Sequence, residues 1–119
     1  MERKIVARDG FGQSASSMKD DTFQAFVLDQ LRELPDVASR AMFGGFGLYC
    51  GRSFFGIVFH GRLYFKVSDA TRTDYEARGM KPFRPSAKQT MKSFYEVPAD
   101  VVEDRATLLA WASQAISPD

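Results

Sequence analysis

Apolar residues near the start of the chain recur at helical spacing. They lie three or four residues apart and would share one side of a helix: Phe23, Phe26, Val27, Leu31 and Leu34. Asp21 is followed three residues later by Gln24, which is the arrangement of a helix capping box. Pro35 pushes the residue before it out of helical geometry. We therefore predict a helix that starts at Asp21 and ends before Pro35, with this apolar stripe buried.

The centre of the chain changes from helical spacing to strand spacing. Three runs rich in aromatic and branched residues, AMFGGFGLYC, SFFGIVF and RLYFKVS, lie at residues 41–50, 53–59 and 62–68. The turn signals Gly51-Arg52 and His60-Gly61 separate them. Connections this short join only antiparallel neighbours. Residues 41–68 are therefore predicted to form a three-stranded antiparallel meander.

Alternation within the third run predicts one buried and one exposed face. The two alternating sets are Leu63, Phe65 and Val67, which we expect to be buried, and Arg62, Tyr64 and Lys66, which we expect to face water. Eight of the eleven phenylalanines lie between residues 43 and 94, so an aromatic core is expected in this part of the chain.

The last part of the chain returns to helix twice. A helix is predicted over residues 68–79, where Ser68 or Asp69 can cap the start and Gly79 can supply a left-handed residue at the end. Extended segments follow at residues 81–85 and 92–97, and Pro98 closes the second. A final helix opens at Asp104 and buries one apolar face: Leu108, Leu109, Trp111, Ala112, Ala115 and Ile116. The predicted order is α-β-β-β-α-β-β-α, a two-layer α+β fold in which helices cover one face of an antiparallel sheet.

Length and composition describe one domain with little net charge. The chain has 119 residues and a formal net charge of +1, which excludes a protein that coats nucleic acid through overall positive charge. Residues 1–18 show no sustained periodicity, so we predict a mobile extension there and one domain over residues 19–119; whether Met18 is the natural start stays open. Cys50 is the only cysteine, which permits no intramolecular disulfide and fits the cytoplasm. No apolar run approaches membrane-helix length, so no membrane partner is expected.

Three sequence motifs occur in an order that points to a known family. They are RAMFGGFGLYCG, LYFKVSDATRTDYEARGMKPFRP and MKSFYEVPADVVEDRATLLAWASQAI, at residues 40–51, 63–85 and 91–116. Together they resemble the TfoX N-terminal domain family over roughly residues 22–116. The residues that carry this likeness are Met42, Phe43, Gly44, Gly45, Gly47, Leu48, Gly79, Pro82, Phe83, Tyr95, Pro98 and Trp111.

The resemblance implies a fold and a role. The implied fold is the secretion-chaperone-like α-β3-α-β2-α arrangement, which agrees with the predicted order. Longer members, the TfoX or Sxy competence regulators, are coactivators of DNA-uptake genes that work with the cyclic-AMP receptor protein and carry a second, helical domain. Because the chain ends at Asp119, directly after the last predicted helix, we expect a single-domain member without that second domain. The family has no established catalytic residues, so the resemblance implies a regulatory module rather than an enzyme.

The glycine-rich run at residues 44–47 has two interpretations. A phosphate cradle needs its glycines in a loop after a strand, at the start of a helix. Here Leu48, Tyr49 and Cys50 follow, then a turn and another predicted strand, so we predict no nucleotide cofactor. We expect Gly44 and Gly45 to make a bulge or bend, and Gly47 to allow a ring or another backbone to approach. A surface where the backbone of a partner approaches remains the alternative.

Candidate catalytic chemistry is sparse. His60 is the only histidine, and we expect it to serve the turn at His60-Gly61. Cys50 and His60 lie at opposite ends of the SFFGIVF strand, which argues against a nucleophile and base pair and against a shared metal site. Asp100, Glu103 and Asp104 are interpreted as a solvated helix start. We therefore expect no catalytic, metal or cofactor residues.

A basic segment is the most suggestive feature for binding. Residues 78–92 carry five basic residues and no acid, interleaved with one phenylalanine, so we select as a possible partner surface Arg78, Lys81, Phe83, Arg84, Lys88 and Lys92. A solvated loop, nucleic-acid contact and an acidic protein surface all stay open for this segment.

Three functions are weighed on these grounds. The first is a regulatory module that binds a protein partner, including a second copy of itself through an exposed sheet edge. The second is a nucleic-acid-associated regulator that uses the basic segment. The third, a small enzyme, requires convergent ionisable groups that the sequence does not offer.

Overall fold

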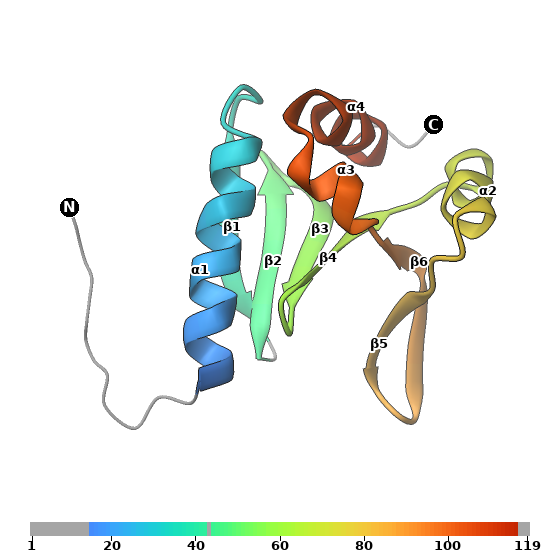
Figure 1. The fold of residues 1–119 in the computed structure, drawn as a ribbon, viewed down its shortest axis with the longest axis horizontal. Helices are drawn as coiled ribbons and strands as arrows, with labels where there is room; N and C mark the ends of the chain where they lie inside the picture. The colour runs from blue at the N-terminus through green and yellow to red at the C-terminus, as the bar shows by residue number, and fades with distance from the viewer. Residues whose placement is uncertain (1–14, 43, 117–119) are drawn as a thin grey trace.

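The computed structural model describes residues 15–42 and 44–116, which form four helices and six strands. In chain order these are α1 (Ala15–Gln30), β1 (Val37–Met42), β2 (Gly45–Cys50), β3 (Ser53–Phe59), β4 (Arg62–Lys66), α2 (Asp69–Ala77), β5 (Pro82–Ser86), β6 (Gln89–Glu96), α3 (Ala99–Glu103) and α4 (Arg105–Ile116). The strands form one antiparallel sheet in the order β1-β2-β3-β4-β6-β5, so the predicted α+β class is confirmed (Figure 1).

Helix α1 starts earlier than the sequence predicts. It begins at Ala15, so Asp21 lies inside the helix and the predicted capping box there is wrong. Residues 15–18 belong to this helix rather than to the predicted extension, whose residues 1–14 lie outside the described part of the chain. The helix ends at Gln30, and tighter turns continue to Leu34, whose backbone N–H donates to the carbonyl of Leu31.

The glycine-rich run makes two strands where one was predicted. Met42 at the end of β1 pairs with Gly45 at the start of β2, so the chain reverses between them. Gly44 has a φ of +83°, which glycine adopts without steric cost. Phe43 lies outside the described residues. The predicted three-stranded meander is therefore a four-stranded one, from β1 to β4.

All four helices pack on one face of the sheet, as predicted. One cluster of buried residues joins Val27 of α1, Leu31 directly after it, Tyr75 of α2, Val101 of α3 and Leu108 of α4 to the sheet. The sheet side of this cluster consists of Leu48, Phe55, Val58, Leu63, Phe65 and Tyr95, with Val67 and Val97 directly after β4 and β6. The predicted buried set of β4 is thus confirmed.

The opposite face of the sheet carries a second, smaller cluster. It consists of Ile57, Tyr64, Phe83 and Phe94, with Phe54, Phe59 and Met91 packed against it. None of the described helices contributes to it, because β5 and β6 bring Phe83 and Met91 onto this face themselves. Tyr64 was expected to face water with Arg62 and Lys66, and this was wrong, since Phe83 covers its ring at 4.7 Å between centroids.

The predicted signals around α2 are confirmed. The Ser68 hydroxyl accepts the backbone N–H of Thr71, and the Thr71 hydroxyl accepts the backbone N–H of Ser68. At the other end Gly79 has a φ of +76°, and the N–H of Met80 donates to the carbonyl of Tyr75 in a Schellman arrangement. Both ends of α2 are therefore satisfied by its own sequence.

A short helix that the sequence did not predict comes before the last predicted one. The short α3 precedes Asp104, and α4 begins at Arg105 directly after it. The Thr107 hydroxyl donates to the Asp104 carboxylate, which agrees with the prediction that a helix opens at Asp104. Trp111 packs edge-on against the ring of Tyr75, with 4.7 Å between centroids, and so connects α4 to α2.

Candidate interaction surfaces

The space beside the glycines of β2 is filled by the protein itself. A β-carbon on Gly45 would lie 2.2 Å from the backbone oxygen of Val58 in β3. A β-carbon on Gly47 would lie 2.5 Å from the sulfur of Met42 and 3.2 Å from the ring of Phe54. The predicted approach of a backbone and a ring is confirmed, and both come from this chain. These glycines therefore allow close packing within the sheet, and atoms of this chain fill the space that a side chain at Gly45 or Gly47 would occupy.

Cys50 and His60 do not converge. Cys50 pairs with Ser53 at the start of β3, whereas His60 follows Phe59 at the end of that strand. The Cys50 thiol lies 3.3 Å from the backbone oxygen of Pro35, to which it donates. His60 has a φ of +53°, as expected for a turn residue, and its ring packs on Phe59 at 4.2 Å between centroids. Their arrangement suits structural roles at two ends of the sheet.

The described residues contain neither a metal-ligand cluster nor a membrane-spanning helix. Between residues 15–42 and 44–116, no three His, Cys, Asp or Glu side chains gather as metal ligands would. None of the helices in that part of the chain is both long and apolar enough to span a bilayer.

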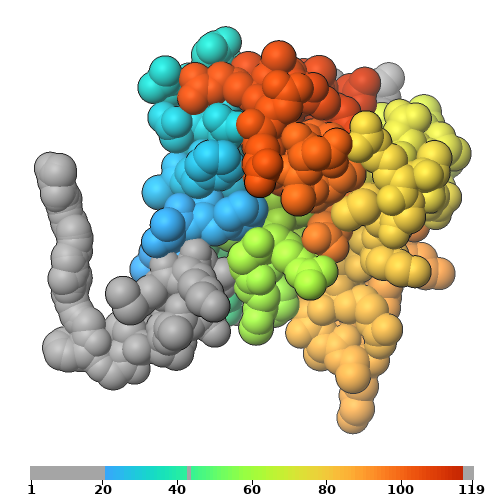
Figure 2. All heavy atoms as spheres, in the orientation of Figure 1, coloured from blue at the N-terminus to red at the C-terminus, as the bar shows by residue number. Residues whose placement is uncertain are grey.

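The predicted basic surface is divided between two places. Arg84, Lys88 and Lys92 lie on or between β5 and β6, a hairpin that projects from the body of the molecule (Figures 1 and 2). All three are exposed, and the Arg84 guanidinium donates to the backbone oxygen of Ala87 at 2.7 Å, which braces the turn. Arg78 and Lys81 lie in the connection between α2 and β5.

Arg78 is held by neighbours in the helix layer. Its guanidinium donates to the Asp100 carboxylate of α3 at 3.2 Å and lies 5.5 Å from the centre of the Trp111 ring. Lys81 is exposed. Arg78 therefore connects α2, α3 and α4, whereas the hairpin carries its own basic side chains separately.

The prediction that Phe83 contacts a partner is wrong. Its side chain is fully buried, with 5.2 Å between its ring centroid and that of Phe59. In β5 the chain turns this ring inward and leaves Arg84 outward. A partner of the hairpin would meet its basic side chains and not its aromatic one.

The two edges of the sheet differ in their chemistry. Among the strands in the described part of the chain, β1 pairs only with β2; it contains no proline and exposes Ala38, Arg40 and Ala41. Strand β5 is the other edge and contains Pro82 and Pro85, which lack the N–H that an added strand would need. The β1 edge is therefore the more suitable one for pairing with another chain.

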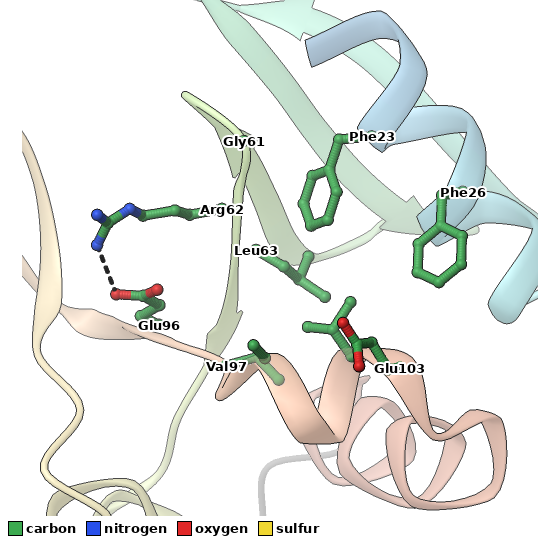
Figure 3. Close-up of a pocket in the computed structure, with 10 residues that line it drawn as sticks. Phe23, Phe26, Gly61, Arg62, Leu63, Glu96, Val97 and Glu103 are labelled. Atoms are coloured by element: carbon green, nitrogen blue, oxygen red, sulfur yellow. Dashed lines mark hydrogen bonds and ion pairs between the residues drawn. The ribbon is translucent and has the colours of Figure 1, made fainter. Parts of the chain in front are cut away.

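A pocket of about 280 Å³ opens in the helix layer (Figure 3). Phe23 and Phe26 of α1 form one side, and Leu63, Val97 and Val102 line it from β4, the end of β6 and α3. Gly61, Arg62, Glu96, Ala99 and Glu103 complete the lining. The sequence predicted Phe26 as part of a buried stripe, and this was wrong, since 41% of its surface is exposed.

Charged groups surround this pocket. The Arg62 guanidinium donates to the Glu96 carboxylate at 3.2 Å, as the dashed line in Figure 3 marks. Glu103 lies exposed on α3, and none of the ion pairs between described residues involves it. Tyr64, the neighbour of Glu96 across β4 and β6, is buried, and burial together with that carboxylate raises the pKa of its hydroxyl. The sequence offered no signal for this pocket, because its residues come from three separate segments, 23–26, 61–63 and 96–103.

Comparison of the sequence with models of known protein families identifies one family. The model of the TfoX N-terminal domain matches residues 29–118, which is most of the chain and includes every motif residue named from the sequence. A comparison with curated protein sequences gives no significant match.

Proposed function

Because the chain belongs to the TfoX N-terminal domain family, we propose that it is a non-catalytic regulatory module that acts by binding another protein in the control of DNA-uptake genes. Family membership supports the regulatory role. The open β1 edge supports the mode of action, because an edge strand without proline or an inward-pointing charge pairs readily with another strand. The simplest such partner is a second copy of the chain, which would extend the sheet from β1 to β1.

The test blocks the edge without disturbing the core. Ala38 and Ala41 are exposed on β1, so the double variant Ala38→Lys, Ala41→Lys adds charge to the pairing edge alone. Ser86→Lys places one such charge on the proline-containing edge and is the control for a lysine at a sheet edge. Sedimentation equilibrium should show self-association of the wild-type chain and of Ser86→Lys, weakened at least about tenfold in the double variant.

Purification from the native cell extends the test to other proteins. Proteins retained by the tagged chain after nuclease treatment should be lost with the β1 double variant and kept with Ser86→Lys. A chain that stays monomeric at every concentration, and retains no protein that depends on β1, would contradict the proposal.

The projecting hairpin supports a second candidate, contact with nucleic acid. Arg84, Lys88 and Lys92 are exposed there, and Glu96 at the end of β6 is the first acid met along that strand. Phosphate contacts would make binding salt-dependent, with a slope that falls by about one for each contact removed. If the triple alanine variant of these residues binds single- and double-stranded DNA with an unchanged salt slope, this candidate is excluded.

A further inference from the structure

We propose that the pocket between α1, β4 and α3 is a docking site for a basic segment of a protein partner, which inserts one large apolar side chain. This site is separate from the β1 edge, since α1, β4, α3 and the end of β6 supply its lining. It would give the regulatory module a means of selecting its partner by sequence.

The size of the pocket suits a single side chain. Sites for small organic ligands usually measure about 300–1,000 Å³. The volume here is about 280 Å³, below that range, and its walls are mostly the apolar side chains of Phe23, Leu63, Val97 and Val102. One phenylalanine or leucine from another chain fits this description better than a cofactor does.

Phe26 indicates that the pocket is open to a macromolecule. Among the described residues it is the one large apolar side chain classed as exposed, at 41%. Its ring lies beside that of Phe23, with 6.5 Å between centroids and 24° between planes, so the two form a continuous apolar rim (Figure 3). A segment that fills the pocket and lies across this rim would cover Phe26, whereas a small ligand inside the pocket would not.

Charge around the pocket selects a cation. Two carboxylates line the pocket, and Glu96 forms an ion pair with Arg62. The other, Glu103, takes part in none of the ion pairs that the described residues form with one another. The three groups together carry a charge of −1. A lysine or arginine beside the inserted side chain would reach Glu103 on the exposed surface of α3. The same carboxylates repel phosphates, which argues against nucleic acid as the occupant.

The test uses a defined peptide and the full chain. The probe is an acetylated and amidated peptide with one phenylalanine between pairs of lysines. Two matched peptides replace the phenylalanine by alanine or the lysines by glutamates. Titration followed by amide chemical shifts should move the signals of Phe23, Phe26, Gly61 and Val102. Each matched peptide should bind at least about tenfold more weakly than the probe.

Two variants assign the binding to the pocket. Glu103→Lys should weaken the probe about three- to tenfold and strengthen the glutamate peptide, whereas Glu33→Lys makes the same charge change away from the pocket and should alter neither. Phe26→Ala should weaken the probe several-fold, and its exposure predicts an unchanged fold, to be checked by the amide spectrum.

Several outcomes would overturn the proposal. Equal binding of the lysine and glutamate peptides would show that the pocket does not select charge. Shifts confined to other surfaces would place the binding elsewhere. Self-association that the probe displaces, and that Lys88→Glu in the hairpin abolishes, would make a second copy the occupant. The probe should bind the β1 double variant as tightly as it binds the wild-type chain. Loss of the pocket proposal would therefore not contradict the function proposed for the β1 edge.

Discussion

The two faces of the sheet are closed by different means. On one face four helices deliver most of the buried side chains, among them Val27, Val101 and Leu108. On the other face the strands do so without any helix, as Phe83 of β5 packs on Tyr64 of β4 and Phe59 of β3. The helix-covered face is the main core, and the aromatic face is a smaller one that depends on a single hairpin.

This difference teaches where the domain is expected to open first. Of the described strands, only β6 pairs with β5, and the register between them is irregular on both sides of Phe83. The hairpin is therefore secured chiefly by its buried aromatic ring, whereas the helix layer is secured by many apolar contacts from several elements. Regions with fewer buried contacts open locally at lower free energy.

The largest expected loss of stability comes from substituting one of two adjacent phenylalanines that lie on opposite faces of the sheet. Phe55 is fully buried under the helices, so Phe55→Ala should reduce the free energy of unfolding by about 3–5 kcal/mol. Phe54 is half-buried between the rings of Tyr49 and Phe94, and Phe54→Ala should cost about half as much. Denaturant titration measures both. A larger loss for Phe54→Ala would reverse the ranking of the two faces.

The next effect tests whether the aromatic face opens separately. Phe83→Ala removes the fully buried ring of β5 and should cost about 3 kcal/mol. Hydrogen exchange should then accelerate at the amides of β5 and β6 while those of α4 keep their protection. Lys92→Ala, on the exposed surface of β6, is the control and should change neither. Equal acceleration in α4 would show that the two clusters unfold as one unit.

The smallest expected effect is on the stability of the domain at alkaline pH, where one tyrosine on each face of the sheet can be compared. Burial raises the pKa of Tyr75 above its ordinary value of 10.0, with Asp74 adding to the shift, and it also raises the pKa of Tyr64. The folded state therefore holds these protons more tightly than the unfolded state does. Their contribution to stability is complete below pH 10 and is lost as the pH rises above it.

For each tyrosine the loss should approach about 1.4 kcal/mol per pH unit above 10. Because Tyr75 has the larger shift, Tyr75→Phe should flatten the decline of stability above pH 10 more than Tyr64→Phe does. Urea titrations at neutral pH and at several alkaline values provide the measurement. An identical slope in both variants and the wild type would mean that neither hydroxyl is coupled to folding.

Local signals predicted most of the secondary structure. Ser68 and Gly79 delimit α2 because capping and the left-handed conformation depend on residues within one turn. Strand alternation placed Leu63, Phe65 and Val67 in the main core for the same reason. The start of α1 was missed, since a capping pattern at Asp21 can equally lie inside a longer helix.

Long-range arrangement was beyond these signals. Tyr64 became buried because β5, from a segment almost twenty residues further along the chain, brings Phe83 across it. The pocket arose in the same way, since Phe26 and Glu103 meet only when α1 and α3 share one face of the sheet. The basic residues of the hairpin were identified from the sequence, but the burial of Phe83 among them was not.

Strand β3 separates the two kinds of information most clearly. The run SFFGIVF alone determines a strand, because its residues favour extended backbone. Regular alternation would place Phe54 and Ile57 on opposite faces, yet both lie in the aromatic cluster. The register of β2 with β3 shifts at Phe55 and adds one residue there, so the alternation is reset. Such a shift is decided only when β3 pairs with a neighbouring strand. The two registers differ in energy through the contacts of β3 with other elements, which the sequence of β3 alone does not specify.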